Sequence, residues 1–188
     1  MKEFKGLYFV GKAVNLRELQ REDSSQIVAW RNNPELGKYL CREKMSVEQQ
    51  NRFFDQYQQK DNDYYFIAET KREGTPVGSV AIFDVDYSSK NAELGRLLVC
   101  EGYRNLSFEA VFLSLHFAFE ELGLHKIYCQ VQRRNKKALT FFTSLGFHQE
   151  GLFTQHYFDG EKFLDIVFLS MFKTDYSKVK QGFMASTV

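Results

Sequence analysis

The run Trp30-Arg31-Asn32-Asn33-Pro34 has residue types that could hold a small charged molecule. Its arginine can clamp a phosphate or carboxylate through two hydrogen bonds, its asparagines can bind hydroxyl groups, and its tryptophan can stack on a ring. The same run also fits a helix end, with Trp30 in the core and Pro34 as the stop, because the residue before a proline avoids the helical region. The core interpretation is favoured for Trp30, whereas the role of Arg31 stays open.

Metal chemistry is not expected from the histidines and cysteines. No histidine has a second ligand at metal-binding spacing; the residues are His116, His125, His148, His156, Cys41, Cys100 and Cys129. Three scattered cysteines indicate reduced thiols in a cytoplasmic protein. A net charge of +1 does not favour a nucleic-acid partner. No apolar run reaches the roughly 18 residues needed to span a membrane, so no membrane partner is expected.

The chain has the size and composition of one domain with a sizeable core. It has 188 residues, of which 44% are hydrophobic and 16% aromatic. The last residues are polar, so we expect a single domain at 1–173 and a loose C-terminal tail at 174–188.

The elements that position these residues follow a definite order. We expect a strand over 7–19, a helix ending near Asn33, and a helix that begins with the capping box of Ser46 and Gln49. The later elements are strands at 64–69, 77–83 and 92–99, an apolar helix at 107–122, a strand at 125–131, a helix capped by Asn135, and a hairpin at Asp159-Gly160. The crossover from 92 to 131 implies one parallel pair in a mostly antiparallel sheet flanked by helices, a mixed α/β fold.

This order resembles the GNAT acetyltransferase fold over nearly the whole chain. Residues 91–99 are similar to the bulged central strand of that family, and residues 103–110 lie where its pyrophosphate loop lies. Residues 135–147 resemble its Asn-x-x-Ala…Tyr-x-x-x-Gly-Phe segment. The similarity is greatest to the branch of ribosomal-protein and nucleotide-amino-sugar acetyltransferases.

The resemblance implies acetyl-CoA as co-substrate. The parallel strands would splay, and the pantetheine arm would pair with the central strand like an added strand. The pyrophosphate would lie at the start of the long helix. The implied cofactor-binding residues are Leu97, Leu98, Val99, Arg104, Asn105, Leu106, Ser107, Phe108, Asn135, Lys137 and Phe142. For the adenosine phosphates the candidates are Arg133, Arg134, Lys136 and Lys137, which also suit a solvated basic turn.

The chain departs from the family pattern at three positions. Ser107 and Glu109 replace small residues of the pyrophosphate loop. A carboxylate there would repel a pyrophosphate unless its side chain points away or pairs with a cation such as Arg104. Phe142 stands where many relatives carry the tyrosine that protonates the leaving thiolate. Its loss is mild, since a thiol with a pKa of roughly 8.5 leaves tolerably as thiolate.

The expected reaction is direct attack of an amine on the thioester. Glu93 is the candidate base by its place in the central strand, and the backbone N–H near Leu98 is the candidate oxyanion donor. Water or a nearby tyrosine, Tyr128 or Tyr157, could serve as the proton donor in place of the tyrosine that Phe142 replaces. Glu93 also fits a surface strand glutamate or a salt bridge to Arg96 or Arg17. The substrate candidates are Arg31, Asn32 and Tyr157.

We therefore expect an N-acetyltransferase that acts on a primary amine of a small molecule, an amino sugar among them. Acetylation of a protein N-terminus and acetylation of a polyamine are alternatives, and Glu35, Glu43 and Glu48 are the carboxylates available to a polyamine. A catalytically degenerate GNAT domain that serves as a binding protein is a further alternative. A homodimer is compatible with each of these.

Overall fold

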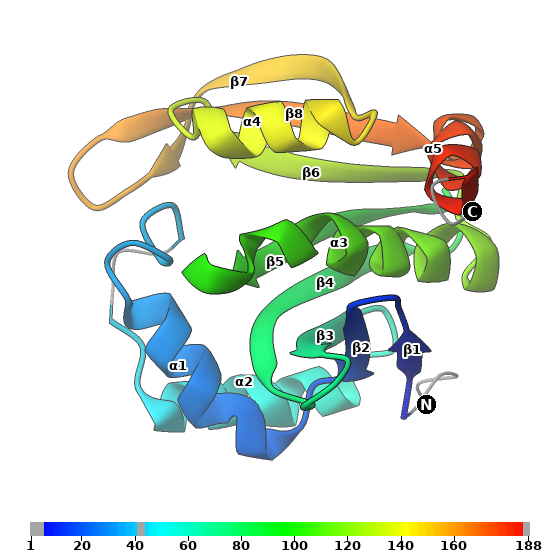
Figure 1. Ribbon diagram of the computed structural model, residues 1–188. Helices are drawn as coiled ribbons and strands as arrows, with labels where there is room; N and C mark the ends of the chain where they lie inside the picture. Colours follow the sequence, from blue (N-terminus) through cyan, green and yellow to red (C-terminus); the bar gives the residue numbers. More distant parts are fainter. Residues whose placement is uncertain (1–5, 41–43, 186–188) are drawn as a thin grey trace. The chain divides into compact units, whose positions relative to one another are not determined.

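The computed structural model describes residues 6–40 and 44–185 and confirms the mixed α/β architecture (Figure 1). The strands are β1 (Tyr8–Val10), β2 (Val14–Glu18), β3 (Tyr64–Thr70), β4 (Pro76–Asp86), β5 (Asn91–Val99), β6 (Lys126–Gln132), β7 (His148–Phe158) and β8 (Phe163–Phe172). The helices are α1 (Ser24–Asn32), α2 (Val47–Gln59), α3 (Ser107–His116), α4 (Lys136–Ser144) and α5 (Lys173–Ala185). In the described part of the chain, no helix is long and apolar enough to cross a membrane.

The strands form one 8-stranded sheet in the order β1-β2-β3-β4-β5-β6-β8-β7. Antiparallel pairing joins β1 to β2, β2 to β3, β3 to β4, β6 to β8 and β7 to β8. Strands β5 and β6 pair in parallel over Asn91–Lys126, Ala92–Ile127 and Glu93–Tyr128. The predicted crossover, with α3 between two parallel strands, is therefore confirmed.

The chain divides into two compact units that are interleaved in sequence. Unit 1 contains residues 1–84 and 95–114, and unit 2 contains residues 85–94 and 115–188. The chain therefore passes from one unit to the other after residues 84, 94 and 114, so that β4, β5 and α3 each contribute residues to both units.

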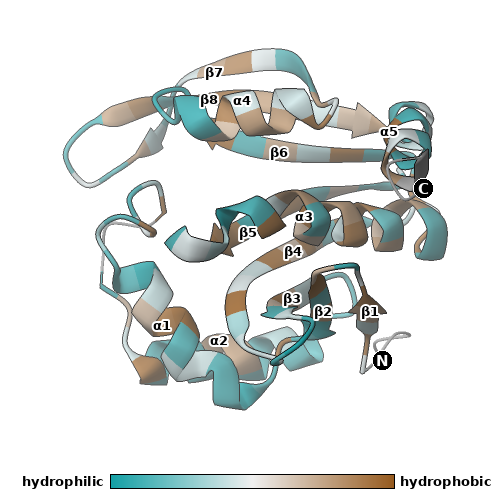
Figure 2. Cartoon of the chain, viewed as in Figure 1, coloured by the Kyte–Doolittle hydropathy of each residue, from teal (hydrophilic) through white to brown (hydrophobic). Residues whose placement is uncertain are grey.

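The core of unit 1 packs α1 and α2 against β3 and β4. Its buried cluster includes Ile27, Trp30, Tyr57, Tyr65 and Ile67. Trp30 is only 5% exposed, so the structure places this side chain in the core. Figure 2 shows apolar stretches in α1 and β4, two of the elements that pack in this core.

The first strand was expected to run over 7–19, and this prediction is wrong. The chain turns at 11–13, so that β1 and β2 form a hairpin in which Tyr8 pairs with Arg17. The apolar residues on both sides of the turn hide this break in the sequence, because each half alone has a strand pattern.

The C-terminal segment also differs from expectation, because residues 173–185 form helix α5 instead of a loose tail. Tyr176 is fully buried. Its ring stacks on Phe119 at 5.0 Å, and its hydroxyl lies 3.1 Å from Nδ1 of His116. Tyr176 thus anchors α5 to unit 2, together with Lys173 and Lys180, which bind the Phe119 carbonyl and the Glu120 carboxylate. His116 is a hydrogen-bonded structural residue.

Candidate functional site

Strand β5 has an irregular backbone at Arg96, where the bulge was expected. Arg96 has a φ of 50°, which L-residues rarely adopt within a strand. Just beyond it, β4 approaches very closely, because a Cβ on Gly78 would overlap the carbonyl oxygen of Leu98. Only glycine fits at that point. Leu98 is buried, whereas the predicted cofactor residues Leu97 and Val99 are half-buried.

The predicted pyrophosphate loop is helical. Residues 101–106 form a 3₁₀ helix that continues into α3 at Ser107, and the Ser107 N–H donates to the carbonyl of Arg104. Three of the predicted cofactor residues, Arg104, Asn105 and Leu106, lie in the 3₁₀ helix. Ser107 and Phe108 are the first two residues of α3. The Arg104 guanidinium is about half exposed, 3.7 Å from the exposed carboxylate of Glu101. Because the Ser107 N–H is already bound within the helix, the exposed Arg104 guanidinium is the feature here that suits a phosphate group.

Glu109 points away from any phosphate at this helix start. Its carboxylate is bound by three backbone N–H groups of the β1–β2 turn: Ala13 N lies 3.0 Å from Oε2, Val14 N lies 3.2 Å from Oε2, and Lys12 N donates to Oε1. The residue is only 8% exposed. A Cβ on Gly11 would lie 2.6 Å from Oε1, so glycine leaves room for the carboxylate. The Glu109 carboxylate is therefore bound within the β1–β2 turn, which is one of the two arrangements that would spare a pyrophosphate its repulsion.

Ser107→Gly tests the helix start alone. Glycine removes the Ser107 side chain from the expected pyrophosphate position and leaves Glu109 in place. We expect acetyl-CoA to bind about 2- to 5-fold more tightly, a change of less than ~1 kcal/mol, as measured by calorimetry. Weaker binding by the variant would mean that the Ser107 hydroxyl contacts the phosphate itself.

In unit 2, the two predicted catalytic residues are neighbours. Glu93 on β5 and Tyr128 on β6 are directly paired, so their side chains lie on the same face of the sheet. The Tyr128 ring stacks on Phe168 at 4.9 Å. The Glu93 carboxylate accepts a hydrogen bond of 3.1 Å from Nε2 of Gln130.

Sequence reasoning missed Gln130, although it lies two residues after Tyr128 and therefore on the same face of β6. Cys129, between them, points to the opposite face and is buried. Burial and the charge of Glu93 raise the pKa of the Cys129 thiol well above its usual range, so it stays protonated. It is not a nucleophile at neutral pH.

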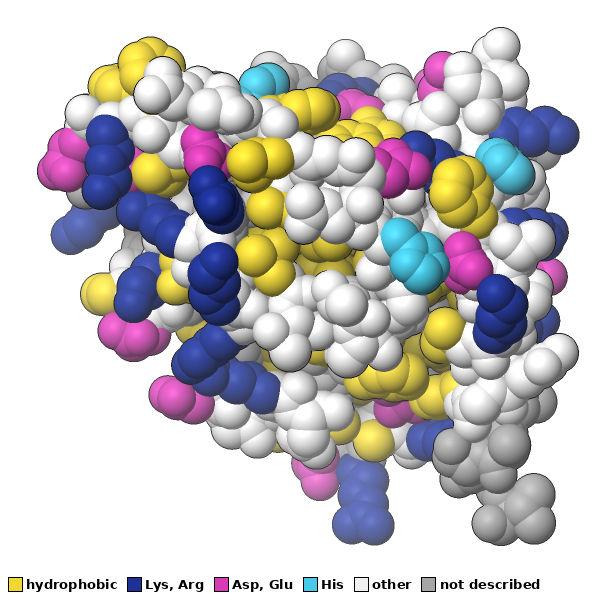
Figure 3. Space-filling view, turned by 90° about the horizontal axis from the view of Figure 1, so that it is seen from above, with side chains coloured by type: hydrophobic (Ala, Val, Ile, Leu, Met, Phe, Trp, Pro, Cys, Tyr) yellow, Lys and Arg dark blue, Asp and Glu magenta, His cyan; other side chains and the backbone are white. Residues whose placement is uncertain are grey.

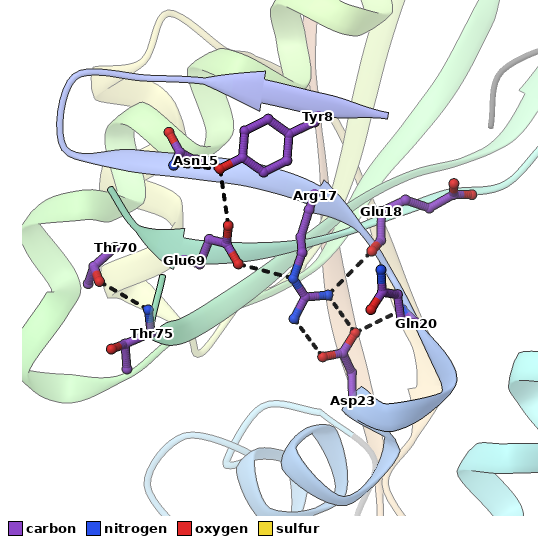
Figure 4. A network of polar contacts seen from close by, with 9 residues as sticks. All are labelled: Tyr8, Asn15, Arg17, Glu18, Gln20, Asp23, Glu69, Thr70 and Thr75. Carbon is purple, nitrogen blue, oxygen red and sulfur yellow. Dashed lines mark hydrogen bonds and ion pairs between the residues drawn. The ribbon is translucent and has the colours of Figure 1, made fainter. Parts of the chain in front are cut away.

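The two arginines proposed as salt-bridge partners of Glu93 bind other carboxylates, all within unit 1. Arg96 binds Asp63, and Arg17 binds Asp23 and Glu69. Figure 4 shows the Arg17 guanidinium between these two carboxylates, with Glu69 also reached by the Tyr8 hydroxyl. The hydrogen bond to Asp23 is the main reason why the pKa of Arg17 is raised. The network fixes the turn that leads into α1.

The predicted segment at the start of α4 has mixed roles. Asn135 caps the helix as expected, with its Oδ1 accepting from Ala138 N at 3.2 Å. Phe142 is 5% exposed and packs on Phe141 and Phe147, at 5.3 Å and 5.2 Å between ring centroids. Its ring belongs to the core of unit 2, whereas Lys137 is exposed.

Basic side chains next to this segment border a groove of about 450 Å³. Its lining comprises Arg133, Arg134, Lys136 and residues 162–165. Arg133 pairs with Asp165 at 3.0 Å and Arg134 with Asp159 at 3.4 Å. Figure 3 shows Lys and Arg side chains grouped at the left of the view, the side on which the β7–β8 hairpin lies in Figure 1. The groove suits a phosphate group, although Arg133 and Arg134 are already paired with carboxylates.

The substrate candidates of α1 separate into two kinds. The Asn32 side chain binds the backbone of Met45 twice, at 2.8 Å to the carbonyl and 2.9 Å from the N–H, so it orders the start of α2. Arg31 is half-buried. Burial raises the pKa of the Tyr65 hydroxyl, and the charge of Arg31 offsets part of this rise. Tyr157 lies on β7 opposite Leu164 and is half-buried. Glu43 and Cys41 lie outside the described residues.

Comparisons with known proteins agree with this geometry. A family profile described as an acetyltransferase (GNAT) domain matches residues 13–148. Spermidine N(1)-acetyltransferase of Escherichia coli K12 is 24% identical over 167 residues, which are 87% of this chain and 88% of that protein.

Two solved structures share the fold. Spermidine N-acetyltransferase from Vibrio cholerae, in complex with CoA and spermine, has a TM-score of 0.81 at 22% identity, over 89% of this chain and 99% of that one. A nucleotide-linked sugar GNAT in its apo form also has a TM-score of 0.81, at 19% identity, over 96% of this chain and 98% of that one. The protein therefore belongs to the GNAT family of acetyltransferases, enzymes that transfer an acetyl group from acetyl-CoA to an amine.

Proposed function

We propose that this protein acetylates a primary amine of a small aliphatic polyamine, with Glu93 as the base and Tyr128 as the acid. The observation that carries the proposal is the direct pairing of these two residues on one face of unit 2. A carboxylate beside a phenol supplies a proton acceptor and a proton donor at neighbouring positions.

In the proposed reaction, Glu93 removes a proton from the substrate ammonium, directly or through one water molecule. The neutral amine attacks the thioester carbonyl, the C–S bond breaks, and the thiolate of CoA takes a proton from Tyr128. The second proton that the amine nitrogen loses on forming the amide returns to Tyr128 through water, so the phenol is restored. Gln130 holds the Glu93 carboxylate by its hydrogen bond of 3.1 Å and so orients it. Because Phe142 is a core residue without a hydroxyl, Tyr128 takes over the acid role.

Residues of unit 1 are proposed to hold acetyl-CoA. The backbone of Leu97–Val99 would bind the pantetheine arm, with the N–H of Leu98 as oxyanion donor. The start of α3, with Arg104 and Ser107, would bind the diphosphate. When bound, acetyl-CoA supplies the activated acyl group, and the Glu109 carboxylate stays in the β1–β2 turn.

The choice of a polyamine rests on the relatives, together with two exposed carboxylates. Spermidine acetyltransferases match this chain over most of its length. The buried carboxylates of unit 1 already bind cations or backbone N–H groups, as Asp23, Asp63 and Glu109 do. Exposed Glu35 and Glu48 are available to ammonium groups. A hydrogen bond from Ser46 lowers the pKa of Glu48, so this carboxylate stays charged.

A nucleotide-linked amino sugar is the second candidate acceptor. Arg31 favours it, because a half-buried guanidinium at the end of α1 suits a phosphate better than an ammonium group. The fold similarity to a nucleotide-linked sugar GNAT is compatible with this acceptor.

Release of CoA thiol, followed with a thiol reagent, decides between the acceptors. We expect acetyl-CoA turnover with spermidine or spermine, and little with a nucleotide-linked amino sugar or a peptide with a free N-terminus. Turnover with the amino sugar alone would replace the polyamine by the second candidate. If no acceptor is acetylated although acetyl-CoA binds, the domain acts as a binding protein.

A further inference from the structure

Arg96 occupies a backbone position that arginine would not be expected to hold. Its φ of 50° lies in the left-handed region, which favours glycine, yet the residue lies inside β5 with Gly95 just before it. Such a conformation persists in a non-glycine residue when the surrounding structure over-determines it. The contacts of Arg96 should therefore reveal what holds the strand in this shape.

The side chain of Arg96 is held from several directions, all within unit 1. Its guanidinium binds both oxygens of Asp63, at 2.6 Å and 3.0 Å, and the Asp63 side chain is only 1% exposed. The rings of Phe53, Tyr65 and Phe83 surround the same guanidinium, with centroids at 5.1 Å, 5.2 Å and 4.3 Å from Cζ. A two-pronged ion pair inside an aromatic cage leaves the guanidinium very little freedom.

The backbone of Arg96 is held as well. Its carbonyl oxygen accepts a hydrogen bond of 2.9 Å from the Ser79 hydroxyl on β4. The side chain and the carbonyl together fix the left-handed turn of the strand at this residue. The course of the next three residues, Leu97–Val99, follows from that turn, because the backbone has only two free torsions per residue.

We infer that Arg96 is a positioning residue for acetyl-CoA: its ion pair with Asp63 sets the bulge of β5, which directs the Leu97–Val99 backbone toward the bound thioester arm. The inference rests on the proposed role of these backbone groups. Arg96 itself does not contact the cofactor in this scheme. Without the ion pair, β5 relaxes toward a regular strand and its N–H and C=O groups turn away from the positions that bind the arm.

Two substitutions at Arg96 distinguish the effect of its side-chain contacts from the effect of its backbone conformation. Arg96→Lys keeps the charge but loses the planar fork that binds both oxygens of Asp63. Arg96→Gly adopts a φ of 50° without strain and leaves a cage that free guanidinium ion can fill. We expect acetyl-CoA to bind about 10-fold more weakly to Arg96→Lys, and at least as weakly to Arg96→Gly. Millimolar guanidinium should restore binding in Arg96→Gly alone.

Arg17→Lys is the matched control, because Arg17 also makes a two-pronged ion pair in unit 1, with Asp23 at 2.8 Å. It should lose stability in a melting experiment and keep the wild-type dissociation constant for acetyl-CoA. Calorimetry with acetyl-CoA needs no acceptor amine. It is done well below the lowest melting temperature among the wild type and the three variants. A folded Arg96→Lys that binds acetyl-CoA within about twofold of wild type would overturn the positioning role. Absence of binding by the wild type would instead overturn the proposed function.

Discussion

Replacing Glu93 by glutamine is expected to lower kcat by about 100-fold or more at neutral pH, the usual contribution of a general base. Glutamine keeps the size of the side chain and can still pair with Gln130, but it cannot accept a proton from the substrate ammonium. The KM for acetyl-CoA should change little, since Glu93 is not among the residues proposed to hold it.

The pH profile identifies the role more sharply than the rate at one pH. An aliphatic amine has a pKa near that of lysine, roughly 10.4, so bulk solvent deprotonates the acceptor at high pH. The rate of Glu93→Gln should therefore rise about tenfold per pH unit toward pH ~10 and approach the wild-type rate there.

Glu150→Gln is the control for this experiment, because Glu150 is another strand carboxylate of unit 2. It binds Lys126 and Ser170, and these hydrogen bonds lower its pKa, Lys126 most strongly. This variant should keep the wild-type kcat and the wild-type pH profile. An equal loss of rate in both glutamine variants, or a Glu93→Gln profile parallel to that of the wild type, would remove Glu93 from the proton transfer.

Glu109→Ala is expected to destabilise the protein by about 2–4 kcal/mol, because a buried carboxylate that accepts hydrogen bonds from three backbone N–H groups is lost. For a protein of this size, that loss lowers Tm by roughly 5–15 °C. Thermal unfolding followed by circular dichroism measures it.

The control for Glu109→Ala is Glu101→Ala, in the 3₁₀ helix that precedes α3, where the side chain is 82% exposed. Its Tm should stay within about 2 °C of the wild type, since an exposed ion pair contributes little. Equal melting temperatures for the two variants would show that the turn at 12–14 holds without the carboxylate.

From the family pattern alone, joint replacement of Ser107 and Glu109 by glycine would be expected to tighten the binding of acetyl-CoA. The structure predicts instead that the second of these changes mainly costs stability.

Elements with a strong local pattern could be predicted from the sequence. The capping box of Ser46 and Gln49, the cap at Asn135 and the hairpin at Asp159 are each made by residues a few positions apart, and all three are confirmed. The break between β1 and β2 was missed because Glu109, almost 100 residues away, holds that turn. Helix α5 was missed because contacts with distant residues hold this segment, such as the stacking of buried Tyr176 on Phe119 and the ion pair of Lys180 with Glu120.

The sequence indicated which residues could form the candidate site. It did not predict the contacts that hold those residues in place. The parallel pairing of the strands that carry Glu93 and Tyr128 was expected and is confirmed, whereas the register that places the two residues side by side was not predicted. The ion pair of Arg96 with Asp63 could not be predicted, since nothing in the local pattern links a strand residue to a loop residue 33 positions away. Asn32 likewise has the residue type of a sugar-binding side chain but binds the backbone of Met45.

The interleaving of the two units has a consequence for biosynthesis. Residues 1–114 contain everything that unit 1 requires, so this unit can close while the ribosome is still translating the remainder. The stretch 85–94 has by then emerged, yet its parallel partner at 126–128 comes more than 30 residues later, and β8 later still. During that interval Asn91–Glu93 is an unsatisfied strand edge, exposed to aggregation or to chaperones. Slow translation after residue 114 should therefore harm the yield of this protein more than slow translation before residue 84.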